Sequence, residues 1–166
     1  DHIATVFAKT EAVAKTMDEH GWHSLWLAEH HFSPERSVLA SPLIIASSIA
    51  TRTTRIRVGL AVQVLPLTNP LRVAEEAATV DHISKGRFEF GIGRSGLTRY
   101  YHGYNVDYAE SKDRFFEALD ALARDELGLP EYDFYFHRMR WAFAKMQRIL
   151  GAIVIISAAN VRYRIH

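Results

Sequence analysis

The chain has 166 residues, of which 48% are hydrophobic and 23% charged, which is an ordinary composition for a globular protein. Its 20 basic and 19 acidic residues leave a net charge of +1, which argues against a polybasic nucleic-acid-binding arm and against an acidic tail. There is no cysteine, so disulfides, thiol nucleophiles and cysteine metal sites are excluded.

Strands and helices are predicted to alternate along the chain. The first predicted element is an amphipathic helix over residues 10–20, which Thr10 can cap and Gly21 ends. Short apolar strands follow near residues 24–28, 56–62 and 88–92, which places them about 32 residues apart. Each strand precedes a predicted helix, and these helices cover residues 43–50, residues 71–83 and a segment that Ser111 opens.

Proline pairs mark two of these helix starts, and a loop separates the third strand from its helix. Ser41-Pro42 and Asn69-Pro70 each combine a capping residue with a proline at the first helical position. The loop is rich in glycine and tyrosine. Its tyrosines, which could stack on a ligand or lie in an ordinary surface loop, are Tyr100, Tyr101 and Tyr104.

Toward the C-terminus the pattern is less decisive. Residues 153–156 are predicted to form a further strand. Residues 131–150 fit either a strand or a helix, because their apolar side chains match both periods. No linker or low-complexity stretch is visible, so residues 1–166 are predicted to form a single domain.

The regular βα repeat indicates an α/β fold with a parallel sheet and crossover helices. It suits either an open doubly wound sheet or a (β/α)₈ barrel of the TIM type. A complete barrel takes about 250 residues, so under the second interpretation this chain is an incomplete barrel.

Two histidines follow the first strand in the sequence Glu29-His30-His31. Ligands of parallel α/β folds bind at the carboxyl ends of the strands, and an imidazole there can act as an acid or base or bind a metal. Adjacent residues point to opposite sides, so one of the two histidines is expected to be structural. His82 lies within a predicted helix, away from such an end, and no metal site is predicted.

The segment from Gly91 to Gly96 matches the G-x-G-x-x-G pattern of dinucleotide-binding folds. The predicted loop after Gly96 and the helical position of Asp113 argue against a nicotinamide dinucleotide site. Arg94 could clamp a phosphate or be a solvated side chain in a plain turn, and both interpretations stay open. The small residues from Gly59 to Val62 could likewise admit a flat ring or simply pack in the core.

Several segments together resemble the bacterial luciferase-like flavin monooxygenase family. They occur in family order and spacing, and they are residues 21–32 (GWHSLWLAEHHF), 57–70 (RVGLAVQVLPLTNP), 72–76 (RVAEE) and 81–94 (DHISKGRFEFGIGR). The resemblance implies a (β/α)₈ barrel, of which this chain would cover roughly strands two to five. It also implies an enzyme that uses reduced FMN and O₂ to oxidise a small organic substrate.

The resemblance leaves two alternatives for the activity. A sister branch of the family uses the deazaflavin F420 for hydride transfer, although the Glu-His-His sequence looks more like the FMN branch. The chain could also belong to a non-catalytic flavin-binding subunit.

The resemblance also assigns roles to individual residues. His30 falls on a histidine that assists proton transfer near the flavin, and Gly93 falls where luciferase has a reactive cysteine. Residues of the family that contact the cofactor fall on Ala61 and Val62 (a cis peptide against the ring), Leu97 (a ring contact), and Arg94 and Lys112 (the phosphate). Ser157 and Asn160 stand where the family has a second phosphate-binding loop.

The expected partners follow from the same resemblance. A flavin reductase would supply the reduced flavin, because no nicotinamide site is predicted in this chain. A homodimer would form through the helices at residues 43–50 and 71–83. No apolar run reaches the roughly 20 residues of a membrane span and no signal peptide is visible, so a cytoplasmic location is expected, without nucleic-acid or membrane partners.

Overall fold

A computed structural model describes residues 2–123 of the chain. The described residues form two compact units. The first comprises residues 2–63 and 75–91, and the second comprises residues 64–74 and 92–123.

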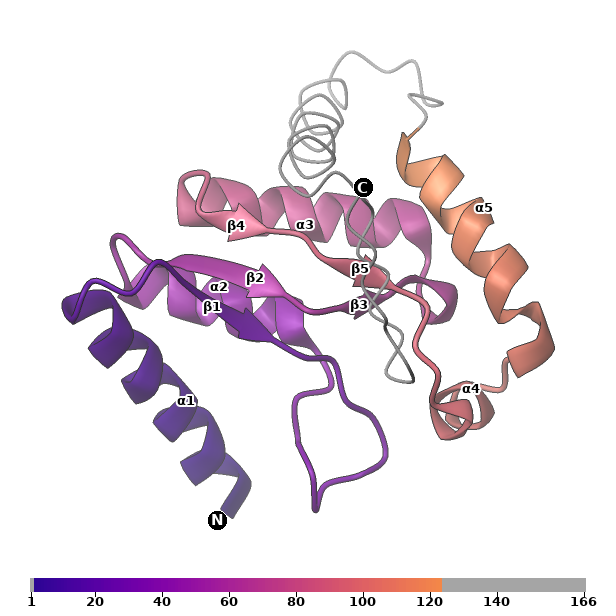
Figure 1. The fold of residues 1–166 in the computed structure, drawn as a ribbon, viewed down its shortest axis with the longest axis horizontal. Coiled ribbons are helices and arrows are strands. Elements are labelled where there is room, and N and C mark those ends of the chain that lie inside the picture. The colour runs from indigo at the N-terminus through magenta and orange to yellow at the C-terminus, as the bar shows by residue number, and fades with distance from the viewer. Residues whose placement is uncertain (1, 124–166) are drawn as a thin grey trace, which may run out of the picture. The chain divides into compact units, whose positions relative to one another are not determined.

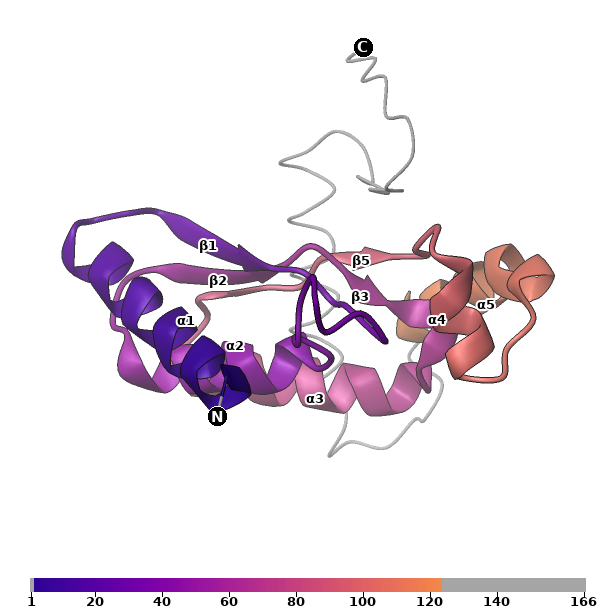
Figure 2. The ribbon, with the colours of Figure 1, turned by 90° about the horizontal axis from the view of Figure 1, so that it is seen from below.

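The first unit is a parallel sheet with helices on one side (Figures 1 and 2). Strand β1 (Ser24–Leu27) pairs with β2 (Arg57–Leu60), which pairs with β4 (Phe88–Glu89), in the order β1-β2-β4. Figure 2 shows α1 (His2–Glu19), α2 (Pro42–Arg52) and the part of α3 (Pro70–Ser84) that belongs to this unit on the same side of the sheet. The parallel strands and intervening helices confirm the α/β prediction for this part of the chain.

Burial explains why these segments form the core. Val58 and Leu60 of β2 are fully buried, as are Ala46 and Ile49 of α2. The apolar side chains of α2 recur three to four residues apart, which gives the helix one stripe to cover the sheet. Burying such side chains stabilises the fold by about 1.5–3 kcal/mol for each large one.

A buried carboxylate joins the end of α1 to the loop before β2. One carboxylate oxygen of Asp18 accepts hydrogen bonds from the backbone N–H groups of Arg55 at 2.8 Å and Ile56 at 2.7 Å. The other accepts from the N–H of Thr54 at 2.9 Å. Burial raises the pKa of Asp18, but these hydrogen bonds lower it by more, to about 2.

Arg87, just before β4, holds the end of α2. Its guanidinium donates to the carbonyl oxygens of Ala50 at 2.7 Å, Ile56 at 2.8 Å and Thr53 at 3.1 Å. It also donates to the hydroxyl of Thr53 at 3.0 Å. The planar fork of an arginine presents five N–H donors on three nitrogen atoms and can reach several carbonyl oxygens at once, whereas a lysine has three donors on a single nitrogen.

We expect Arg87→Ala to lower the free energy of unfolding by about 2–3 kcal/mol, because it leaves several carbonyl oxygens without donors. The free energy of unfolding of Arg87→Lys should lie between those of Arg87→Ala and the wild type. Urea denaturation of the full protein measures the effect, and the exposed Arg36 offers a matched control in Arg36→Ala. Equal stabilities of Arg87→Ala and Arg36→Ala would contradict the assigned role.

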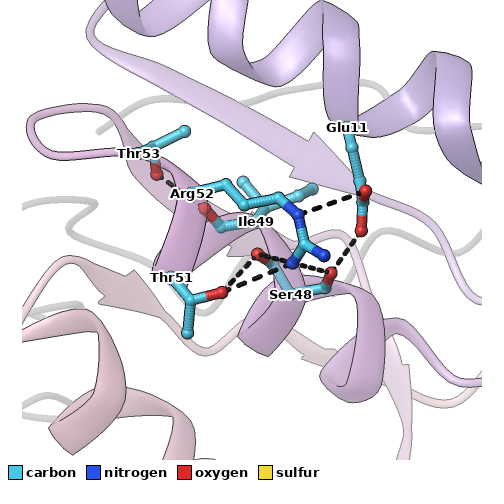
Figure 3. A network of polar contacts seen from close by, with 6 residues as sticks. All are labelled: Glu11, Ser48, Ile49, Thr51, Arg52 and Thr53. Atoms are coloured by element: carbon cyan, nitrogen blue, oxygen red, sulfur yellow. Dashed lines mark hydrogen bonds and ion pairs between the residues drawn. The ribbon is translucent and has the colours of Figure 1, made fainter.

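Polar contacts also tie α1 to α2 at the outer surface (Figure 3). Glu11 of α1 accepts a hydrogen bond from the hydroxyl of Ser48 and lies 3.3 Å from Nε of Arg52. Arg52 in turn donates to the hydroxyl of Ser48 at 2.7 Å. These groups are partly exposed, so the network orients the two helices more than it stabilises them.

An indole ring lies against a glycine on the sheet. Trp26 of β1 is in register with Gly59 of β2. A Cβ atom added at Gly59 would meet ring atoms of Trp26 at 2.3–2.6 Å, which is far inside van der Waals contact. Position 59 is therefore closed to any side chain while the indole keeps its place.

The second unit contains Val64 of the short strand β3 (Gln63–Val64), the strand β5 (Ile92–Gly93) that pairs with β3, and a 3₁₀ turn η1 (Leu65–Leu67). Helix α4 (Thr98–Gly103), turn η2 (Tyr108–Glu110) and helix α5 (Ser111–Ala123) follow. Helix α5 contacts η1. Its buried side chains include Phe115, Ala118 and Leu122, which recur at helical spacing.

The structure corrects the prediction of a tyrosine-rich surface loop. Tyr100 and Tyr101 lie in α4 and are fully buried, so only Tyr104 is exposed. The helix was missed because it has six residues and is bounded by glycine-rich sequence, which leaves too few positions to show a helical period.

Element boundaries differ from the prediction in three further places. The first helix begins at His2, and Thr10 lies inside it, where its hydroxyl donates to the carbonyl oxygen of Val6 at 2.9 Å instead of capping. The predicted strand at 56–62 is shorter in the structure, where β2 ends at Leu60 and β3 begins only at Gln63. The predicted strand at 88–92 is interrupted, into β4 and β5.

Other predicted boundaries are confirmed. Gly21, with a φ of +78°, follows the end of α1. Asn69 accepts from the N–H of Arg72 at 3.1 Å, as a capping residue does. Residues 131–150, residues 153–156, Ser157 and Asn160 lie outside the described residues, and the single domain over residues 1–166 stays a prediction.

Candidate functional site

The first cluster of candidate residues lies at the carboxyl ends of the parallel strands in the first unit. Glu29 and His31 follow β1 and are both buried, at 8% and 5% exposure. Nε2 of His31 lies 2.7 Å from Oε1 of Glu29. His31 therefore has a structural partner, as expected for one of two adjacent histidines.

Gln63 belongs to the same cluster and is the first residue of β3, which follows the carboxyl end of β2. Its side-chain Nε2 donates to Oε2 of Glu29 at 2.7 Å, and its backbone N–H donates to the carbonyl oxygen of Gly91 at 2.8 Å. Gln63 is a site residue that the sequence did not predict. The available signal was a polar residue at the centre of an apolar run, Val62-Gln63-Val64.

His30 lies between the two anchored residues and is half-buried. Its backbone N–H donates to the carbonyl oxygen of Leu39 at 2.9 Å, which ties the strand end to the loop that follows it. Because Glu29 and His31 are both held by side-chain contacts, the backbone that carries His30 is fixed on both sides.

Ala61 and Val62 connect β2 to β3, and the peptide bond between them is cis. This agrees with the cis peptide that the resemblance implies at these positions. The N–H of Ala61 donates to the carbonyl oxygen of Leu27 at 2.7 Å. Both side chains are half-buried, so part of their surface is open.

The second cluster surrounds Arg94, which follows β5 in the second unit. Nη1 of Arg94 donates to the hydroxyl of the buried Ser111 at 2.7 Å, and its guanidinium carbon lies 5.4 Å from the ring centre of Tyr108. The hydroxyl of Tyr101 donates to the carbonyl oxygen of Arg94. The guanidinium is thus held in place at both its backbone and its tip.

The hydrogen-bonding state of this cluster follows from its surroundings. Burial raises the pKa of Tyr101 more than the nearby Arg94 guanidinium lowers it, so the phenol stays protonated and can donate at neutral pH. Among residues 2–123, no carboxylate forms an ion pair with Arg94. A positioned, uncompensated guanidinium is suited to bind an anion.

The other predicted site residues of the second unit are placed as follows. Lys112 is exposed in the first turn of α5, directly after Ser111. Leu97 is half-buried and precedes the first residue of α4. The structure thus brings Arg94 to Ser111, Tyr101 and Tyr108, and it leaves the Lys112 side chain in solvent.

The described residues offer neither a metal-ligand cluster nor a membrane-spanning helix. Within residues 2–123, no three histidine, aspartate or glutamate side chains gather as metal ligands would. None of the helices in this part of the chain is both long and apolar enough to cross a membrane.

Comparisons with known proteins match most of the chain. A family model described as luciferase-like monooxygenase matches residues 2–151. The chain is 36% identical to 4-hydroxyprotoasukamycin monooxygenase of Streptomyces nodosus subsp. asukaensis, over 68% of this chain and 30% of that protein.

Solved structures agree with the sequence match. The crystal structure of monooxygenase RslO1 from Streptomyces bottropensis superposes with a TM-score of 0.69 at 29% identity, covering 73% of this chain and 38% of that one. A Baeyer-Villiger monooxygenase component encoded on a Pseudomonas putida plasmid, solved with FMN, superposes with a TM-score of 0.64 at 21% identity. That match covers 69% of this chain and 33% of the other. The chain spans about a third of the length of the curated relatives it matches.

Proposed function

Since the chain belongs to the luciferase-like monooxygenase family, we propose that it is part of a flavin-dependent monooxygenase that oxidises a small organic substrate with O₂ and reduced FMN. Family membership and the named monooxygenase relative support this proposal. A bound reduced flavin would supply the electrons that react with O₂. The protein would bind the flavin and the substrate, orient them, and exclude water.

The observation that carries the proposal is the state of Arg94. Its guanidinium is positioned by Ser111 and Tyr108 and has no carboxylate partner among the described residues. A phosphate monoester, such as that of FMN, offers the oxygens that an arginine fork binds best. Lys112 is one residue from Ser111 and would add a second, solvent-exposed positive charge.

The first cluster would serve the ring of the flavin. Ala61 and Val62 present part of their surface at a strand end and would lie against the ring, with Leu97 as a further ring contact. His30 would hold or move a proton near the reacting part of the flavin, because an imidazole can do both near neutral pH. Ser157 would contribute to phosphate binding.

Removing the phosphate anchor tests the proposal directly. We expect Arg94→Ala to weaken FMN binding about 10- to 100-fold, which corresponds to the loss of about 1.5–3 kcal/mol from charge-assisted hydrogen bonds. Riboflavin, which lacks the phosphate, should bind both proteins equally. Fluorescence titration of the full protein with both ligands measures these affinities.

A matched control is Arg114→Ala, because Arg114 lies on α5 in the same unit and pairs with Glu110 on the surface at 2.8 Å. This variant should bind FMN like the wild type. Absence of saturable FMN binding to the wild type, or equal loss of FMN and riboflavin binding in Arg94→Ala, would count against the phosphate site.

The alternatives predict different cofactors or no turnover. An F420-dependent oxidoreductase of the same fold would carry a deazaflavin, whose absorption spectrum differs from that of FMN. A non-catalytic subunit would bind flavin without consuming O₂. The absorption spectrum of the cofactor that purifies with the full protein, followed by an oxygen-electrode measurement, separates these three outcomes.

The wider architecture is part of the same proposal. The β1-β2-β4 sheet with helices on one side is a segment that a (β/α)₈ barrel can contain. We propose that the chain as a whole covers roughly strands two to five of such a barrel. We further propose a flavin reductase as the source of reduced FMN and a homodimer through α2 and α3. Ile44 of α2 and Leu71 and Ile83 of α3 are exposed apolar side chains, as such a contact would need.

A further inference from the structure

The side-chain carbonyl oxygen of Gln63 is buried and accepts no hydrogen bond from any residue in the part of the chain that the structure describes. The residue as a whole is only 6% exposed. An unpaired buried acceptor costs about 1–3 kcal/mol, and native structures keep few such groups. A buried acceptor that lacks a donor near a strand end is therefore a candidate for pairing with a ligand.

The orientation of the Gln63 amide is determined by its neighbour. A carboxylate can only accept hydrogen bonds, so the amide must turn its NH₂ group toward Oε2 of Glu29, 2.7 Å away. The carbonyl oxygen then points away from Glu29. His31 holds the other oxygen of Glu29 at 2.7 Å, so two successive contacts fix where the free acceptor lies.

The position of Gln63 in the fold favours a ligand as the missing donor. Gln63 lies just beyond the carboxyl end of β2, and Glu29 lies just beyond that of β1. Ligands of parallel α/β folds bind at this end of the strands. Gln63 is also the next residue after Ala61 and Val62, which the proposed function places against the flavin ring.

We propose that Gln63 recognises the flavin ring by accepting a hydrogen bond from the imide N–H of its pyrimidine part. This inference rests on the proposed function and adds a specificity-determining residue to it. The chemistry is complementary, because the imide carries one N–H donor and Gln63 has one acceptor to offer once its NH₂ group is engaged. Glu29 and His31 act as positioning residues that keep the amide from turning over.

A cycle of ligand and protein changes tests this contact in the full protein. The probes are oxidised FMN and N3-methyl-FMN, in which a methyl group replaces the imide hydrogen. We expect the wild type to bind FMN at least about tenfold more tightly than N3-methyl-FMN, since one good hydrogen bond at a buried site is worth about this factor. Gln63→Leu should bind FMN about tenfold more weakly and should lose most of the discrimination.

A second variant keeps the network intact while removing the acceptor. In Gln63→Lys the ammonium group can still donate to Glu29, so loss of discrimination in this variant cannot be attributed to a collapsed Glu29–His31 pair. Circular dichroism and thermal unfolding check that both variants are folded. Fluorescence quenching gives all six affinities without any need for turnover.

The outcomes separate the two levels of the proposal. If the wild type binds FMN but both variants keep its preference for FMN over N3-methyl-FMN, Gln63 does not recognise the imide and a buried water is the better partner for its oxygen. If the wild type binds neither flavin, the proposed function fails together with this inference. Loss of discrimination in both variants, with FMN still bound through its phosphate, supports the contact.

Discussion

Replacing His30 by alanine is expected to slow the reaction of the reduced flavin with O₂ and substrate by about 10²- to 10⁴-fold, the usual contribution of a positioned acid or base. The physical reason is that alanine carries no acid or base, while the side chains of the neighbouring Glu29 and His31 are bonded to each other. The affinity for FMN should change little, because the proposed phosphate anchor, Arg94, is unaltered in this variant. Stopped-flow absorbance of the full protein loaded with reduced FMN measures the rate.

Chemical rescue makes this prediction specific. Alanine at position 30 leaves room for free imidazole, which should restore part of the rate in a concentration-dependent way. His20→Gln is the matched control, because His20 is exposed, directly follows α1, and hydrogen-bonds the carbonyl oxygen of Thr16 in that helix. An unchanged rate in His30→Ala would remove the residue from the proposed chemistry.

Asp18→Ala is expected to lower the free energy of unfolding by about 3–5 kcal/mol, because three backbone N–H groups of residues 54–56 lose their acceptor. Asp18→Asn keeps one acceptor oxygen and should lose less. Urea denaturation of the full protein checks both. Glu19→Gln, a change at the exposed neighbouring carboxylate, should alter the stability by no more than about 0.5 kcal/mol.

The stability that Asp18 provides depends on pH in a defined direction. The pKa of Asp18 is about 2 in the folded protein against 3.8 in the unfolded chain, so its contribution is fully present above the unfolded pKa and is lost as the pH falls toward the folded pKa. The stability gap between the wild type and Asp18→Asn should therefore be constant above pH ~5 and should shrink between pH ~4 and ~2. A gap that grows on acidification would contradict the assignment.

Local patterns predicted those parts of the fold that depend on near neighbours. The spacing of the strands is visible because parallel strands need a crossover helix of similar length each time. The helix starts at Pro42 and Pro70 are visible because proline fixes the first helical turn. The cis peptide at Ala61–Val62 came from the family resemblance, and nothing in the composition of these two small residues indicates it.

Long-range contacts account for what the sequence did not reveal. Asp18 lies on a helix whose polar side chains are mostly solvated, and its partners are 36 to 38 residues further along the chain. Gln63 owes its orientation to Glu29, which is 34 residues earlier. In both cases the side chain alone gives no sign of its role, because the role is set by what the fold brings beside it.

The contact between Trp26 and Gly59 limits how this sheet can diverge. A side chain at position 59 requires either that the Trp26 indole move or that a smaller residue replace it, so homologues without this glycine are expected to place a different residue or a displaced ring at position 26. Directed-evolution libraries should therefore hold glycine at position 59 or randomise both codons at once. The effect of a single substitution at position 59 would reflect a steric clash with the Trp26 ring and would give no information about catalysis.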